Sequence, residues 1–201
     1  MEEIGHLPPG FRFDPTDEEL VVHFLQRRAY SLPCYPNIIP DLPLSDFDPL
    51  ELMNNGNKAL VSYNKWYFYS QMTSRGGTDD GVITKNGFWK EVGVVEDIST
   101  DAAARKKVGS KKYLVFFYVG HDGELSPGGI RSNWALEVYQ LCNQFQTRRG
   151  RKQPDVNQWV LCRAQEVNNS GSDHLYPEGL SSTDEACLSI DDDSEEITFP
   201  H

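Results

Sequence analysis

The first clear pattern of apolar positions begins just after residue 16. Its apolar residues are spaced so that they fall on one face of a helix. They are Leu20, Val21, Phe24 and Leu25. Thr16 and Glu19 have the spacing of a capping box, in which each side chain accepts a hydrogen bond from the other residue's backbone amide. The pattern therefore predicts an amphipathic helix with Thr16 as its N-cap.

Further along, five stretches rich in aromatic and β-branched residues are separated by turn signals. They span residues 65–71, 88–95, 112–120, 133–141 and 158–167. The stretch 112–120 is apolar on both faces, which indicates a central strand, whereas 133–141 alternates Trp134, Leu136 and Val138 with other residues. The succession of strands and turns after an early helix predicts an α+β fold with a mostly antiparallel sheet.

Two segments between these elements carry breaker residues. Residues 31–52 contain too many prolines for a continuous helix and predict a loop that ends in one helical turn around Asp48–Met53. Residues 75–81 are rich in glycine and aspartate and predict a loop tip.

Charge is sorted along the chain. The 201 residues carry a formal net charge of −11, which by itself argues against a nucleic-acid partner. However, residues 85–163 hold 13 Lys and Arg against 8 Asp and Glu, and residues 164–201 hold 10 acidic residues and no basic one. This asymmetry indicates an anion-binding second half of the domain followed by a strongly acidic tail.

The same contrasts divide the chain into three parts. We expect a disordered N-terminus at 1–6, one folded domain at 7–166 and an acidic disordered tail at 167–201. The tail intersperses its acids with the apolar residues Leu188, Ile190, Ile197 and Phe199. Two interpretations of the tail stay open: a regulatory segment that binds a co-regulator, or a solubilising extension.

Several function classes find no support in the sequence. The four cysteines show no Cys-x-x-Cys spacing, which favours a reduced, intracellular protein, and the five histidines have no metal-ligand spacing. There is no signal peptide and no apolar run of the roughly 18 residues that a membrane helix needs. No P-loop, Gly-x-Ser-x-Gly or His-Glu-x-x-His pattern is present. We therefore expect no catalysis, no metal, no cofactor and no membrane partner.

The chain also contains seven blocks in a fixed order. They read LPPGFRFDPTDEELVVHFL, YPNIIPDLPLSDFDPLEL, KWYFYS, NGFWKEVG, KKVGSKKYLVFFYVG, RSNWALEVYQL and QWVLCRA. In order and spacing, these blocks resemble the NAC domain of a plant-specific transcription-factor family, from residue 7 to about residue 166. The opening block and the short tail are most similar to the small branch of that family that contains the xylem NAC-domain protein.

The resemblance implies a twisted antiparallel β-sheet flanked by a few short helices, and a dimer formed through the N-terminal arm. It carries the dimer-bridging arginine of the family onto Arg12 and the partner glutamate onto Glu19. The residues alone favour the capping role for Glu19 and the resemblance favours the dimer role, and the two can coexist. The dimer interface that the resemblance implies comprises Leu7, Pro8, Gly10, Phe11, Arg12, Phe13 and Glu19.

The resemblance also implies sequence-specific binding of double-stranded DNA through a strand in the major groove, here residues 88–97. The family reads Trp-Lys-Ala-Thr-Gly-Thr in this strand, and the positions that match are Trp89, Lys90 and Gly93. The positions that differ are Glu91, Val92 and Val94, where the family has alanine and two threonines. A valine fits the methyl group of thymine and a glutamate accepts from the amino group of cytosine, so the chemistry of the reading strand is altered.

Basic positions around this strand meet backbone phosphates in the family. Here they fall on Lys85, Lys90, Arg105, Lys106, Lys107, Lys111, Lys112 and Arg131. A single lysine of this kind is as readily a solvated charge, but the cluster indicates phosphate binding. The four tryptophans, Trp89 among them, are more often core residues than platforms for base stacking.

Two functional hypotheses follow. The first is a dimeric, DNA-binding transcription regulator in the nucleus, a repressor or weak activator in plant vascular development, with basic runs at 104–112 and 147–153 as candidate import signals. The second is a non-enzymatic interaction protein that forms heterodimers with other NAC proteins and lowers their DNA binding, because its own reading strand is altered.

Overall fold

The computed structural model describes residues 10, 12–46, 48–54, 59–71, 77–78, 81–100, 106–119, 129–142, 147–148, 151–152 and 159–167. The helical segments are α1 (Asp17–Glu19), the π-helical η1 (Leu20–Leu25), α2 (Gln26–Ala29), the 3-10 turn η2 (Leu44–Asp46) and α3 (Pro49–Asn54). The strands are β1 (Leu60–Ser62), β2 (Lys65–Gln71), β3 (Gly77–Thr78), β4 (Gly81–Ile83), β5 (Gly87–Thr100), β6 (Lys106–Tyr118), β7 (Ile130–Leu141), β8 (Thr147–Arg148), β9 (Arg151–Lys152) and β10 (Trp159–Glu166). The helices precede the strands in the chain, as the sequence predicts.

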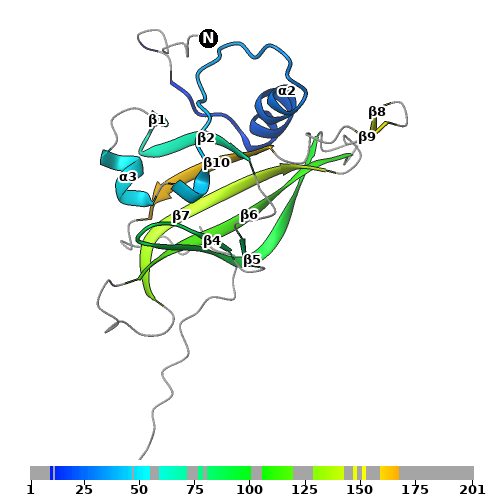
Figure 1. The fold of residues 1–201 in the computed structure, drawn as a ribbon. Helices are drawn as coiled ribbons and strands as arrows, with labels where there is room; N and C mark the ends of the chain where they lie inside the picture. Colours follow the sequence, from blue (N-terminus) through cyan, green and yellow to red (C-terminus); the bar gives the residue numbers. More distant parts are fainter. Residues whose placement is uncertain are drawn as a thin grey trace, which may run out of the picture.

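One twisted sheet organises the molecule (Figure 1). Eight strands follow the order β1-β2-β10-β7-β6-β5-β4-β3, and each neighbouring pair in it is antiparallel; β8 and β9 form a separate pair. The long strands β5, β6 and β7 lie side by side, with β6 between the other two. The predictions of an antiparallel sheet and of a central strand at 112–120 are confirmed.

The early helical run begins with the predicted cap. The Thr16 hydroxyl oxygen accepts from the backbone amide of Glu19 at 3.2 Å, and the Glu19 carboxylate accepts from the backbone amide of Thr16 at 2.8 Å. The helical conformation continues through α1, η1 and α2 to Ala29, and its four predicted apolar residues are all buried. This capping box and the buried face together fix the run against the sheet.

The sheet is covered on both faces. Side chains alternate along β2, so that Tyr67 and Tyr69 join the core beneath the early helix whereas Phe68 joins a second core. The second core also contains Leu44 of η2 and Leu52 of α3, which pack on the opposite face. In Figure 1, α2 and α3 accordingly lie against different parts of the sheet.

The structure corrects some of the predicted boundaries. The expected loop tip at 75–81 contains β3 and the first residue of β4, and β5 runs on to Thr100 instead of ending at residue 95. β6 begins at Lys106, so most of the basic run before residue 112 belongs to the strand. The alternation predicted for 133–141 leaves no exposed face, because β7 lies between two strands and has a core on each side; even Glu137 is buried.

Some predictions fall outside the described residues. They concern Leu7, Pro8, Phe11, Arg105, the N-terminus at 1–6 and the tail from residue 168 onward. Within the described ranges, no helix combines the length and the apolar character that crossing a membrane requires.

Candidate nucleic-acid interface

The predicted reading strand lies at an edge of the sheet. β4 pairs with β5 only from Phe88 to Lys90, so that, among the described residues, the remainder of β5 pairs with β6 alone. We call β5 and β6 together the β5–β6 ribbon, although β6 also pairs with β7 from Gly109 onward. Among the described residues, the second half of β5 is thus an open edge of the sheet, and the major groove of B-DNA admits a pair of β-strands.

The ribbon is interrupted by a bulge. The pairing steps from Val92 opposite Tyr113 to Glu96 opposite Lys111, so that three residues of β5 face the single residue Lys112 of β6. We call these three residues, Gly93, Val94 and Val95, the valine bulge. Gly93 has a φ of 76°, a conformation that residues with a Cβ adopt only at a cost. Gly93 therefore permits the bulge, in which Val94 is 65% exposed and Val95 is 47% exposed.

The acidic residues of β5 pair with the lysines of β6. Glu91 lies 2.9 Å from Lys112, Glu96 lies 3.1 Å from Lys111, and Asp97 lies 2.5 Å from Lys107, each measured from carboxylate oxygen to ammonium nitrogen. These pairs explain why three acids occur in a basic neighbourhood. They also mean that three of the lysines predicted to contact phosphates already have an anionic partner within the chain.

Lys111 belongs to a partly buried network beneath the first helix. Its side chain is only 10% exposed, and its ammonium donates to Asp17 at 2.8 Å. Asp17 also accepts from the Tyr139 hydroxyl at 2.7 Å and from Arg163 at 3.2 Å. Arg163 in turn pairs with the buried Glu137. The network ties the start of the helix to β6, β7 and β10.

The ionisation of this network reflects its contacts. Burial alone would raise the pKa of Asp17, but hydrogen bonds from Lys111 and Tyr139, together with the charges of Arg163 and Lys111, lower it below the usual value. Burial alone would lower the pKa of Lys111, and the hydrogen bond to Asp17 is the largest of the contacts that raise it instead. Both groups are therefore held in their charged forms at neutral pH.

Trp89 is held in the core. Its side chain is 0% exposed and meets Phe116 edge to face, with ring centroids 5.1 Å apart. The expectation that this tryptophan is a core residue is confirmed, and Trp134 is buried as well. The side chains of Trp89 and Lys111 are not accessible in this fold, so the candidate interface excludes them as direct contacts.

The other basic side chains of the predicted cluster lie nearer to solvent. Lys85, Lys90, Lys106, Lys107 and Arg131 are exposed, and Lys112 is about one-third exposed. They are spread along the sheet instead of forming one cluster. Arg131 faces Phe117 near one end of β6, whereas Lys106 lies at the other end. At about 3.3 Å per residue, the two ends of β6 are roughly 40 Å apart, which is close to one turn of B-DNA.

The predicted dimer residues have partners within the chain. The Arg12 guanidinium donates to the Tyr63 hydroxyl at 2.6 Å, and Glu19 is engaged by Thr16. Phe13 is buried between Phe24 and Tyr67, so it anchors the arm to the core. Sequence reasoning missed Tyr63. Tyr63 and Asn64 form the two-residue hairpin turn between β1 and β2, and both have positive φ. Recognising this turn in the sequence would have placed Tyr63 beside the arm.

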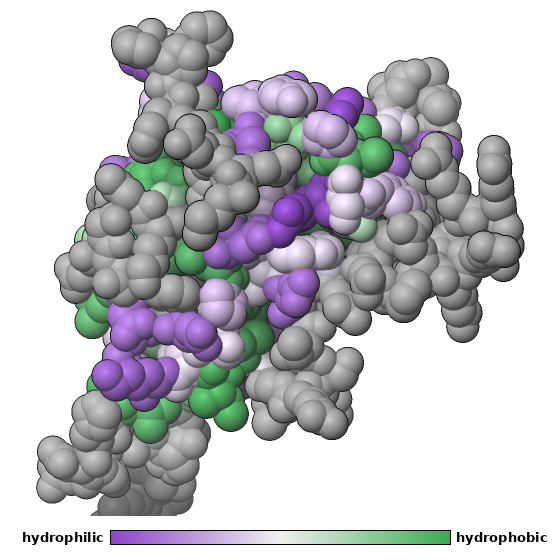
Figure 2. All heavy atoms as spheres, turned by 45° about the horizontal axis from the view of Figure 1, so that its top comes forward, coloured by the Kyte–Doolittle hydropathy of each residue, from purple (hydrophilic) through white to green (hydrophobic). Residues whose placement is uncertain are grey.

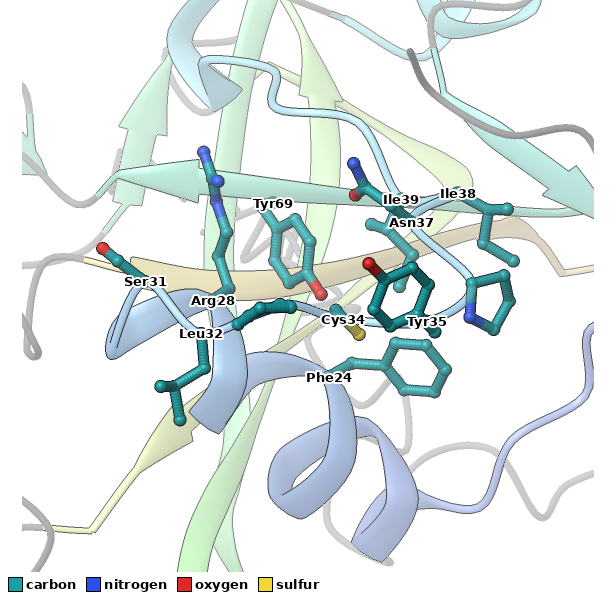
Figure 3. A pocket seen from close by; sticks show the side chains of 12 residues that line it. Phe24, Arg28, Ser31, Leu32, Cys34, Tyr35, Asn37, Ile38, Ile39 and Tyr69 are labelled. Atoms are coloured by element: carbon teal, nitrogen blue, oxygen red, sulfur yellow. The ribbon is translucent and has the colours of Figure 1, made fainter. Parts of the chain in front are cut away.

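A pocket of about 440 Å³ lies between the first helix and the loop that follows it (Figure 3). Arg28, at its rim, pairs with Asp41 and lies 4.3 Å above the ring of Trp159. Burial raises the pKa of the Cys34 thiol in this pocket, which disfavours the nucleophilic thiolate. In the described parts of the chain, no three His, Cys, Asp or Glu side chains gather as a metal site would require.

The surface is mixed in character. On the face that Figure 2 shows, hydrophilic residues form a band between smaller apolar patches. A ligand of this face would therefore meet hydrophilic and apolar residues side by side.

Comparison with known proteins gives consistent results. The family profile "No apical meristem (NAM) protein" matches residues 8–141. The chain is 40% identical to NAC domain-containing protein 104 of Arabidopsis thaliana over 97% of its own length and 100% of that protein's. It is 41% identical to NAC domain-containing protein 18 and 38% identical to NAC transcription factor 25, both from Arabidopsis thaliana, each over 82% of this chain. The chain spans about half the length of these last two relatives.

Proposed function

The chain belongs to the No apical meristem (NAM) family of NAC-domain transcription factors, and from this we propose that it binds double-stranded DNA as a dimer through the β5–β6 ribbon. Membership implies DNA-binding transcriptional regulation and not catalysis. We propose which residues contact DNA, that the protein binds as a dimer, and which kind of DNA site it binds.

The single observation that best supports this function is the charge of the ribbon and of the residues that flank it. The described residues 85–100 and 106–119 carry six lysines and three acids, a net charge of +3 in a chain whose total is −11. Lys85, Lys90 and Lys106 are exposed to solvent. We assign these three and Arg131 to phosphate contacts, with Lys112 joining when DNA displaces Glu91.

Dimerisation through the arm is the second element of the proposal. Arg12 lies near the exposed Tyr63, and Glu19 is at the exposed start of the helix, so both are accessible to a second copy. A bidentate pair between Arg12 of one protomer and Glu19 of the other would add a charge-assisted contact across a two-fold interface. Gly10, with a φ of 86°, is a point at which the arm can turn.

The finer assignments also belong to the proposal. We assign the chain to the small xylem NAC branch on the similarity of its opening block. We further propose nuclear localisation, a role in vascular development as a repressor or weak activator, a domain at 7–166, and a tail that binds a co-regulator.

A salt titration tests the proposal. Duplexes selected from a random pool should bind the protein at low salt, with affinity falling as salt rises. Lys90→Ala should weaken binding to every duplex and flatten the log–log salt dependence by about 0.9, the loss of one phosphate contact.

The matched control is Lys65→Ala, which removes a lysine from β2 near the opposite edge of the sheet. It should bind as the wild type does. Absence of binding to any duplex at low salt, or equal losses for the two variants, would contradict the proposed interface.

The acid–lysine pairs of the ribbon favour one second candidate function. Because they reduce its positive charge, a heterodimer with a relative would bind DNA less well than the relative's homodimer, and this chain would act as a competitor. Mixing the protein with NAC domain-containing protein 18 and a labelled duplex distinguishes the two. Loss of the relative's DNA complex, with no complex formed by this protein alone, would favour the second function.

A further inference from the structure

The valine bulge combines features that packing alone does not explain. Val94 and Val95 are exposed on an edge strand, and the described structure leaves them outside both hydrophobic cores. Edge strands are commonly protected from association by charged side chains, prolines or bulges. Here the bulge does not protect the edge in this way, because it presents two β-branched apolar side chains to solvent.

The surroundings of the bulge specify the chemistry of a partner. Glu91–Lys112 lies on one side of the bulge, and Glu96–Lys111 and Asp97–Lys107 lie on the other. The net charge of the ribbon remains positive, so an anionic partner is attracted, while the side chains of the valine bulge can offer it only alkyl groups. A polyanion with apolar groups at its recognition surface fits both requirements.

The major groove of DNA supplies one alkyl group, the 5-methyl of thymine. Its other groups there are hydrogen-bond donors and acceptors, which a valine side chain cannot satisfy. We propose that Val94 and Val95 select thymine at one or two positions of the bound site by contact with its 5-methyl group. This inference rests on the proposed DNA-binding function and identifies the residues that determine specificity within it.

Gly93 is the residue that positions Val94 and Val95. Its positive φ allows β5 to fit three residues opposite one and so directs the two valines outward. A side chain at this position would strain the bulge, and relief of that strain would turn the valines from their present direction.

Replacement of thymine by deoxyuridine tests the proposal, because the two bases differ only by the 5-methyl group. A duplex selected from a random pool by the wild-type protein is synthesised with each thymine replaced in turn. We expect one or two replacements to weaken wild-type binding by about fourfold each, the value of one buried methyl group. Val94→Ala and Val95→Ala should weaken binding to the thymine duplex and lose this discrimination at the same positions.

Val61→Ala is the matched control, because Val61 is an exposed valine of β1 at the other edge of the sheet. It should discriminate between the two bases as the wild type does. Thermal melting by circular dichroism confirms that each variant is folded.

Each alternative outcome has a separate meaning. Equal binding of every deoxyuridine duplex by the wild type overturns the inference and leaves the proposed function intact. If the valine variants lower self-association in sedimentation but leave DNA affinity unchanged, the bulge contacts protein and the inference is overturned. Absence of binding to any duplex overturns the proposed function itself.

Discussion

Lys111 and Lys112 are neighbours in β6, yet they belong to two different parts of the molecule. Lys111 points toward the first helix, is 10% exposed, and is held by Asp17 and Glu96. Lys112 points to the opposite face, is 32% exposed, and pairs with Glu91 among the residues that the structure describes. Because successive side chains of a strand alternate, a shift of one position converts a structural cation into a surface one.

The two faces use ion pairs for different purposes. Under the helix, the charges of Asp17, Lys111, Arg163 and Glu137 are partly withdrawn from water, so each depends on its partners. Along the ribbon, Glu91–Lys112 and Asp97–Lys107 are accessible to solvent and can exchange partners. Only pairs of the second kind can open to admit a phosphate group without disturbing the fold.

The largest effect should follow from replacing Lys111. Lys111→Met leaves Asp17 and Glu96 without their shared cation and should lower the free energy of unfolding by about 2–4 kcal/mol, between the values for exposed and for fully buried pairs. Urea denaturation measures it, with the m-value checked for a change in the denatured state.

Lys112→Met is the control on the neighbouring position. It should lower the free energy of unfolding by about 0–1 kcal/mol, because its pair with Glu91 is about one-third exposed to solvent. Similar losses for the two variants would show that the division between the two faces is wrong.

The second effect is on acid stability. The pKa of Asp17 is lowered in the folded protein, so its ionised carboxylate stabilises the fold. This stabilisation is fully present above the unfolded-state pKa, near 4, and is lost as the pH falls through the folded-state pKa. Asp17→Asn should therefore be less stable than the wild type at neutral pH, and the difference should shrink below about pH 4.

Urea denaturation at a series of pH values measures this difference. If the difference in the free energy of unfolding between wild type and Asp17→Asn stays constant from neutral to acid pH, the ionisation of Asp17 does not stabilise the fold.

The smallest effect on stability should come from Glu91. Glu91→Gln should change the free energy of unfolding by no more than about 1 kcal/mol, because water still reaches its pair, in which each side chain is about one-third exposed. It releases Lys112, so DNA binding should tighten by roughly fivefold, equivalent to about 1 kcal/mol, and the log–log salt dependence should steepen by about 0.9.

Glu51→Gln, on α3, is the control, because it makes the same change in net charge away from the ribbon. If both variants bind alike, the gain comes from total charge and not from Lys112.

Local rules account for much of the fold. The Thr16–Glu19 box and the spacing of Leu20 to Leu25 predict the first helical run, and strand propensity with turn signals predicts β2 and β10 to within a residue. These features depend on residues close together in the chain, where hydrogen bonds and side-chain periodicity act directly. The boundaries of β5 and β6 were less accurate, because pairing with a neighbour extends a strand into polar sequence.

The candidate site divides in the same way. By itself, the sequence determined that the second half of the domain is basic, that the reading strand carries acids and valines, and that its family is that of the NAC domain. Only the tertiary structure decided which lysines are accessible, that each acid of β5 forms an ion pair with a lysine of β6, and that Asp17 reaches Lys111 across 94 positions of the chain. The physical reason is that charge and hydropathy belong to single residues, whereas burial and pairing depend on strand register and on the bulge, which many distant contacts set together.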